Sequence, residues 1–183
     1  DPATGRLSFV NQAFVNGKNP VHLAVDCSNR FLVVANHVTA GDLVSSLAVL
    51  ALREDGGLGE MTDHVPLTGT IGPHRVEQPF AKPHQVMTDP SGRWFAVPDK
   101  GLDVTACWSL DNHGKLARAP GPAARAREGA GPRHAVFHPN KPFAYIIDEL
   151  SSTLTACRFD AQDGGLAPFQ VISSLPDDFV GFS

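Results

Sequence analysis

The chain has 183 residues and a mass of 19.5 kDa, which is enough for one domain with a substantial hydrophobic core. Its 15 Lys and Arg residues against 19 Asp and Glu give a net charge of -4, and without a basic cluster this disfavours nucleic-acid binding. No apolar run is long enough to span a bilayer and no signal-peptide pattern is present, so the sequence predicts a soluble protein that does not bind membranes. Because the sequence opens at Asp1, export is left open.

The three cysteines, Cys27, Cys107 and Cys157, are odd in number and lack the CxxC spacing of metal or redox sites. Cys107 and Cys157 occupy the same position of a repeat, in TACWSL and TACRFD. We interpret them as small side chains of the core. Free cysteines fit best with a reduced, cytoplasmic compartment.

The first stretch, Ala3–Val15, combines a glycine-containing turn with alternating apolar residues, which predicts a turn followed by a short strand. It is similar to three later stretches that close repeating units, Asp55–Val65, Asn112–Pro120 and Gln162–Ile172. Residues 1–19 are therefore expected to be part of such a unit.

The next unit, residues 20–82, is expected to hold four short strands. The first three are His22–Asp26, Phe31–Asn36 and Ser46–Leu52, with a turn at Cys27–Arg30 and an Asp-Gly-Gly turn before the fourth. Two long inserts, Thr39–Ser45 and Thr68–Ala81, interrupt the unit. The second insert carries His74, Arg75 and Glu77 on an irregular loop, and loops on a rigid scaffold are frequent functional positions.

The same plan recurs in residues 83–131 and 132–183, where each unit again opens with Pro and a His within two residues. Asn, Asp, Gly and Pro stand at the expected turns. The predicted strands are Gln85–Thr88, Trp94–Pro98 and Val104–Leu110 in one unit, and His134–Phe137, Phe143–Ile147 and Thr153–Phe159 in the other.

Equivalent glycines set the length of the repeat: Gly57 and Gly114 are 57 residues apart, and Gly114 and Gly165 are 51 apart. Units of roughly 50 residues with four strands are typical of β-propeller blades. A β-sandwich also uses short strands, but it would not repeat one motif three times. The sequence therefore predicts an all-β fold, with about three and a half blades of a β-propeller, fewer than the roughly four to eight that a closed propeller needs.

The two ends of a β-hairpin lie on the same side of a blade, so residues that begin the first strand lie near those that end the second. This places His84, Arg133 and His134 on one rim with Asp99, Lys100, Asp148 and Glu149, where a small anion and an acid–base pair could meet. His22, His84 and His134 are assigned one repeat position, where each also has a structural interpretation as a cap of its strand. Arg133 likewise has a structural interpretation, as an ion-pair partner of Glu149 or Asp148.

Several other residues have structural interpretations. Asp26, Asp89 and Asp111 stand beside turns and are interpreted as turn formers. Trp94 and Trp108 are expected to pack between sheets. His134 and His138 would stand about 13 Å apart on a strand, so they cannot chelate one metal ion. No serine-hydrolase elbow or phosphate-binding glycine loop is present, and no cofactor or metal is expected.

Three stretches resemble the lactonase family of seven-bladed β-propellers: AKPHQVMTDPSGRWFAVPDKGLD, GAGPRHAVFHPNKPFAYIIDELSSTLTAC and QVISSLP. The resemblance covers essentially the whole chain. It implies seven blades, and hence a protein about twice this long. It also implies metal-independent chemistry on lactone rings with acidic groups, as in the propeller-type 6-phosphogluconolactonases and the carboxymuconate lactonising enzymes.

The resemblance also implies site residues. The family's His falls on His84, its first Arg on Arg133 and its Glu on Glu149, while its second Arg belongs to a later blade that these residues do not contain. Arg75, Lys100, His134 and Asp148 are weaker substrate-binding candidates. The expected reaction is hydrolysis of a small acidic sugar lactone, with carboxymuconate cyclisation or a non-enzymatic binding propeller as alternatives. The sequence does not specify an oligomeric state.

Overall fold

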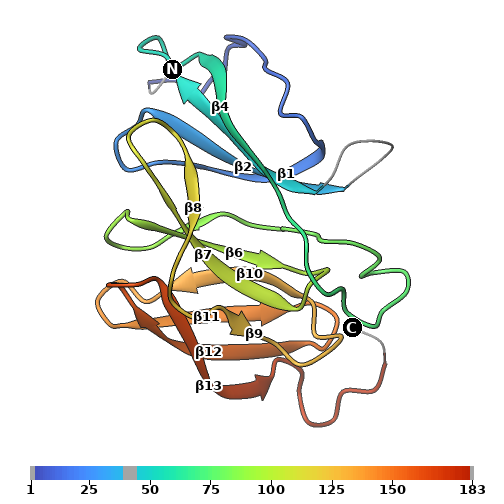
Figure 1. The fold of residues 1–183 in the computed structure, drawn as a ribbon. Helices are drawn as coiled ribbons and strands as arrows, with labels where there is room; N and C mark the ends of the chain where they lie inside the picture. Colours follow the sequence, from blue (N-terminus) through green and yellow to red (C-terminus); the bar gives the residue numbers. More distant parts are fainter. Residues whose placement is uncertain (1–2, 39–44, 182–183) are drawn as a thin grey trace.

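The computed structural model describes residues 3–38 and 45–181, in which all regular structure is β-strand. The strands form three separate antiparallel sheets, which Figure 1 shows arranged one after another. The first sheet is β1 (Lys18–Val25), β2 (Phe31–Val38), β3 (Ser46–Leu52) and β4 (Leu58–Pro66). The second is β5 (Met87–Thr88), β6 (Trp94–Asp99), β7 (Val104–Leu110), β8 (Leu116–Arg118) and β9 (Ala124–Arg125), and the third is β10 (Pro132–Phe137), β11 (Phe143–Asp148), β12 (Thr153–Asp160) and β13 (Gly165–Ser173).

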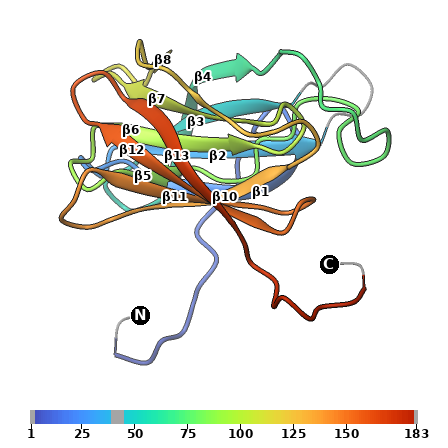
Figure 2. The same cartoon turned by 90° about the horizontal axis from the view of Figure 1, so that it is seen from below.

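Each sheet runs up and down in sequence order, β1-β2-β3-β4, β5-β6-β7-β8 and β10-β11-β12-β13. This order, with the sheets stacked face to face, is that of consecutive propeller blades, so the predicted fold class is confirmed. In Figure 2 the segments before β1 and after β13 leave the stacked sheets on the same side.

Two apolar layers hold neighbouring sheets together. Val33, Val49 and Phe95 lie in the layer between the first and second sheets, and Trp94 and Cys157 lie in the layer between the second and third. The core interpretation of Cys107 and Cys157 is confirmed, since both are buried free thiols whose pKa burial raises to about 12. The central strands β2, β3 and β6 are short and largely buried on both faces, which fixes their register and therefore the residues at their ends.

Aspartates close the first hairpins of two sheets, as predicted. Asp26 Oδ1 accepts from the backbone N–H of Phe31 at 2.7 Å, and Asp89 Oδ1 accepts from that of Trp94 at 2.7 Å. In the third sheet His138 takes this place, and its Nδ1 accepts from the Asn140 N–H at 3.1 Å. These turns lie at the opposite end of the hairpins from the rim predicted to be functional.

The strand predicted within Ala3–Val15 is wrong, because the described residues before β1 form turns and irregular chain. An extended segment becomes a strand only where it has a hydrogen-bonding partner, and here Asn11 uses its side chain instead, donating to Leu58 O at 2.8 Å. Ala13 and Val15 cover the outer face of the first sheet. The insert predicted at Thr39–Ser45 falls almost entirely on residues 39–44, outside the described part.

Two strand predictions need correction. β1 begins at Lys18 rather than His22, because Pro20 is tolerated on an edge strand, where its missing N–H breaks no ladder. β9 was not predicted: β8 and β9 both pair with β7, and residues 119–123 interrupt the outer strand between them. That interval contains Pro120 and Pro122, which cannot donate to a ladder.

Candidate active site

β-bulges place His84 and Arg133 at the rim. On β10, Pro132 pairs with Asp148 and His134 with Ile147, which leaves Arg133 as the extra residue. In the second sheet, Pro83 pairs with Asp99 and Met87 with Ala96, so three residues on the first strand face two on the second. His84 directly follows Pro83, as Arg133 directly follows Pro132, and so occupies the equivalent position. Bulges change the direction of side chains at strand ends.

This register corrects the assignment of His22, His84 and His134 to one repeat position. Pro20 pairs with Asn36 and His22 with Ala35, so His22 and His134 are equivalent to each other, and Arg133 is the equivalent of His84. His84 comes one residue after its Pro, whereas His22 and His134 come two residues after theirs. A motif that accepts a His at either distance could not detect this difference. The bulge itself became visible only from the pairing.

Arg133 bonds to both other main candidates. Its Nε donates to His84 Nε2 at 3.0 Å, and its Nη1 lies 3.2 Å from Glu149 Oε2. That carboxylate oxygen is buried and receives no well-directed hydrogen bond, and His84 Nδ1 is also buried without a partner. The structure therefore brings His84, Arg133 and Glu149 together, with Arg133 paired to each of the other two.

Beyond Glu149, further acidic and basic side chains pair with one another in a chain. Lys100 Nζ lies 3.1 Å from Glu149 Oε1 and 2.7 Å from Glu77 Oε2, and Lys82 Nζ lies 4.0 Å from the same Glu77 oxygen. Lys82 and Lys100 are buried, whereas the Glu77 side chain is 38% exposed. We name this set of five charged residues and two histidines the rim cluster: His37, Glu77, Lys82, His84, Lys100, Arg133 and Glu149.

The two histidines of the rim cluster are held neutral. Their rings pack edge to face at 5.0 Å between centroids. Burial lowers the pKa of His84 to about 4, helped by the positive charge of Arg133, and burial lowers that of His37 to about 4, helped by Lys82 and Lys100. At neutral pH both rings therefore carry one proton each and have one nitrogen able to accept a hydrogen bond.

The weaker candidates lie in different surroundings. Lys100 belongs to the rim cluster, and the exposed His134 ring packs on His84 at 5.1 Å. Arg75 is exposed and makes no ion pair with any residue of the described chain. Asp148 is buried inside the third sheet, where its Oδ2 accepts hydrogen bonds from Thr153 and Thr155, and burial raises its pKa.

Sequence reasoning missed His37 and Lys82 and left Glu77 without a role. His37 follows Asn36 as Lys100 follows Asp99 and Glu149 follows Asp148, so all three occupy one repeat position at the end of a second strand. Aligning the units at these buried polar residues would have revealed His37. Glu77 comes from an irregular loop, for which no repeat position exists.

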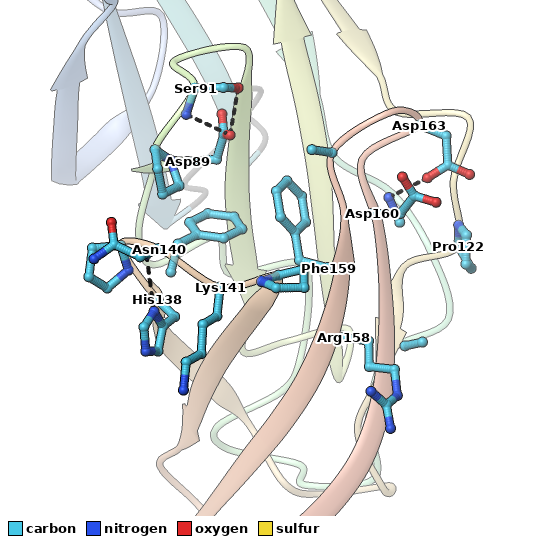
Figure 3. Close-up of a pocket in the computed structure, with 17 residues that line it drawn as sticks. Asp89, Ser91, Pro122, His138, Asn140, Lys141, Arg158, Phe159, Asp160 and Asp163 are labelled. Carbon is cyan, nitrogen blue, oxygen red and sulfur yellow. Dashed lines mark hydrogen bonds between the residues drawn. The ribbon is translucent and has the colours of Figure 1, made fainter.

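A separate pocket lies at the turn end of the second and third sheets (Figure 3). It is about 17 Å along β10 from Arg133 at roughly 3.3 Å per residue. Its polar side chains mostly serve the turns: Asp160 Oδ1 accepts from Gln162 N and Asp163 Oδ1 from Gly165 N, both at 2.8 Å. Proline and phenylalanine form much of the remaining wall, and the His138 Nδ1 of this pocket accepts from the Asn140 N–H of its own turn.

Residues 3–38 and 45–181 contain no group of three or more His, Cys, Asp or Glu side chains that could hold a metal ion. They also contain no helix long and apolar enough to cross a membrane.

Gly101 fixes the loop that carries Glu77, and its replacement tests that role. Gln78 Nε2 donates to Lys100 O at 2.8 Å, and a Cβ on Gly101 would lie 1.8 Å from Phe80 O, a backbone atom that cannot turn aside. Gly101→Ala is expected to destabilise the protein by about 1–3 kcal/mol, measured by urea denaturation. Gly69→Ala is the control, because its Cβ would meet only the flexible Leu102 side chain; equal stability of the two variants would contradict the prediction.

Consecutive antiparallel sheets of four or five strands, with a histidine, arginine and carboxylate cluster at one rim, define a β-propeller whose polar chemistry is gathered at the strand ends. The family model described as "Lactonase, 7-bladed beta-propeller" matches residues 1–183, and the chain belongs to this family.

Related proteins agree with this assignment. The chain is 32% identical to a 6-phosphogluconolactonase of Bacillus subtilis (strain 168), over 98% of the chain and 49% of the relative. It is 29% identical to one of Erwinia tasmaniensis, over 97% and 48%. The chain spans about half the length of these curated relatives.

Solved structures agree as well. A putative 6-phosphogluconolactonase from Bacteroides fragilis superposes with a TM-score of 0.83 and 26% identity, covering 96% of this chain and 49% of the other. A periplasmic gluconolactonase of Pseudomonas aeruginosa gives 0.79 and 25%, covering 91% and 45%.

Proposed function

We propose that the full-length protein hydrolyses a small acidic sugar lactone, in the manner named for its 6-phosphogluconolactonase relatives. The observation that carries this proposal is the bonding of Arg133 to both His84 and Glu149. A guanidinium beside a neutral imidazole and a carboxylate supplies an anion clamp, a base and an acid at one place.

The reaction adds water to the lactone carbonyl and breaks the ring C–O bond. Arg133 binds substrate and stabilises the negative charge that develops on the carbonyl oxygen. When substrate draws its guanidinium away from His84, the Nε2 lone pair becomes free to take a proton from the attacking water. Glu149 orients that water or handles the proton that the leaving ring oxygen requires.

The same three residues are compatible with two alternative functions. In a cyclising carboxymuconate enzyme, His84 and Glu149 would move protons at carbon and at a carboxylate, beside the same clamp. In a non-enzymatic binding propeller, the mutual pairing of His84, Arg133 and Glu149 would be purely structural. Their convergence at one rim, close to two further buried cations, supports the enzymatic reading.

Hydrolysis of 6-phosphogluconolactone by the full-length protein tests the proposal. Acid release is followed at constant pH against the spontaneous rate, and enzymatic turnover well above that rate is expected. A rate equal to the background would exclude this substrate. Turnover of carboxymuconate in the same preparation would then favour the cyclase, and inactivity on both substrates would favour the binding propeller.

The expected partner is the small anionic lactone itself, and we further propose a cytoplasmic location. Three free thiols, Cys27, Cys107 and Cys157, support a reducing compartment. The Pseudomonas relative is named as periplasmic, so location within this family is not uniform. Fractionation of cells that express the full-length protein tests the location, and recovery in an exported fraction would contradict it.

A further inference from the structure

Two buried ammonium groups lie side by side in the rim cluster. Lys82 is 8% exposed and Lys100 is 5% exposed. Lys100 has two carboxylate partners, but among residues 3–38 and 45–181 the carboxylate paired with Lys82 Nζ is that of Glu77 at 4.0 Å, beyond hydrogen-bond distance. The ammonium of Lys82 otherwise lies over the Phe80 ring, 5.3 Å from its centre. No side chain of the described residues accepts a hydrogen bond from this ammonium, and because its side chain is 11% exposed the ammonium is open to an incoming anion.

The backbone holds the two lysines rigidly together. The Lys100 N–H donates to Lys82 O at 3.0 Å, and the Lys82 N–H donates to Asp99 Oδ1 at 2.7 Å. The same Asp99 oxygen accepts from the N–H of Gly101 at 3.0 Å. Because the Asp99 carboxylate binds both backbone segments, the backbones of Lys82 and Lys100 are held next to each other and their side chains start from fixed positions.

The charge of the rim cluster matches an anion. Lys82, Lys100 and Arg133 contribute three positive charges, Glu77 and Glu149 contribute two negative ones, and the histidines are neutral at pH 7. A phosphate monoester carries about -1.5 to -2 at this pH and offers three acceptor oxygens. It can satisfy both ammonium groups, whereas the single Glu77 oxygen bonds well to only one.

The position of Glu77 allows an incoming anion to displace its carboxylate from the two lysines. It comes from the loop before the second sheet, its side chain is 38% exposed, and its contacts within the rim cluster are with the two lysines. Glu149, in contrast, also pairs with Arg133 and follows directly on β11. The Glu77 carboxylate therefore stands where an incoming anionic group would bind.

We propose that Lys82 and Lys100 form a phosphate subsite that selects phosphorylated lactones, and that Glu77 fills this subsite until substrate displaces it. The proposal rests on the proposed lactonase function and assigns the two ends of the substrate. The phosphate binds at Lys82 and Lys100, and the lactone carbonyl lies at Arg133 and His84, on the other side of Glu149.

The test compares two ligands that differ only in the phosphate. Binding of 6-phosphogluconate and of gluconate to the full-length protein is measured by titration calorimetry, which does not depend on turnover. Lys82→Gln is expected to weaken 6-phosphogluconate binding by about 10-fold or more, since charge-assisted hydrogen bonds contribute about 1.5–3 kcal/mol, and to change gluconate binding less than about 2-fold. Lys82→Arg, which keeps the charge, is expected to restore most of the loss.

Glu77→Gln is expected to have the opposite effect on phosphate binding. Because it changes an exposed side chain on a loop, it tests the proposal even if Lys82→Gln fails to fold. It is expected to tighten 6-phosphogluconate binding several-fold without tightening gluconate. Lys115→Gln, an exposed lysine paired with Asp63 elsewhere, is the control and should change neither.

An unchanged ratio of the two affinities in either folded variant would overturn the subsite. Selective binding of 6-phosphogluconate without lactone hydrolysis would instead refute the proposed function and leave the subsite intact.

Discussion

Arg133→Ala is expected to lower kcat/KM for 6-phosphogluconolactone by about 10²–10³-fold, the usual loss when one donor to a developing oxyanion is removed. Two contacts are lost together, the hydrogen bond to His84 Nε2 and the ion pair with Glu149. Steady-state kinetics at pH 7 measures the loss. Burial and, after it, the positive charge of Arg133 lower the pKa of His84, so removal of Arg133 should raise that pKa in part and move the acid limb of the pH profile upward.

Arg93→Ala is the matched control for this change. Arg93 is an exposed arginine of the same half of the chain, stacked on Trp94 at 4.7 Å and remote from the rim cluster. Its replacement should leave kcat/KM within about 2-fold. Full activity of Arg133→Ala, or an equal loss in both variants, would remove Arg133 from the mechanism.

His84→Gln is expected to lower kcat by about 10²–10⁴-fold, the range contributed by a positioned general base. In the unmodified protein the pKa of about 4 keeps His84 neutral, so kcat/KM should stay level from pH 7 to about 5 and fall towards pH 4 as the base is protonated. The residual activity of His84→Gln should lack this acid limb. A single inflection near pH 6.5 in the unmodified protein would contradict the buried, neutral state of His84.

The same pKa shift predicts a change in stability with pH. A histidine in the unfolded chain binds a proton near pH 6.5, whereas His84 and His37 in the fold bind it only near pH 4. The free energy of unfolding therefore falls as pH drops from about 6.5 to 4. The buried Asp99, whose pKa is raised to about 6, acts in the opposite direction. Comparing urea denaturation of His84→Gln with the unmodified protein cancels the Asp99 contribution and should show a smaller fall.

Periodicity explains why the fold was predictable. Alternating apolar residues, turn residues at fixed offsets and a repeat of about 50 residues depend only on local order, and all three sheets followed them. Asp26 and Asp89 were predictable as turn formers for the same reason, since their partners are at most five residues away. The failures, Ala3–Val15 and β9, concern segments whose state depends on whether a neighbouring strand is available.

The candidate site was only partly predictable. His84, Arg133 and Glu149 were found from hairpin geometry and family resemblance, and the structure brings them together. The offset between His22 and His84, however, depends on bulges that only strand pairing reveals.

The sequence by itself therefore determined the blade repeat, the turns and the rim on which polar residues gather, because these follow from local pattern and chain direction. Only the tertiary structure decided which polar residues share that rim as partners. It buried Asp148 behind Thr153 and Thr155 and left Arg75 in solvent. It joined Lys82 and Glu77 to the rim cluster through a loop without periodicity, because burial and ion pairing depend on residues distant in the chain.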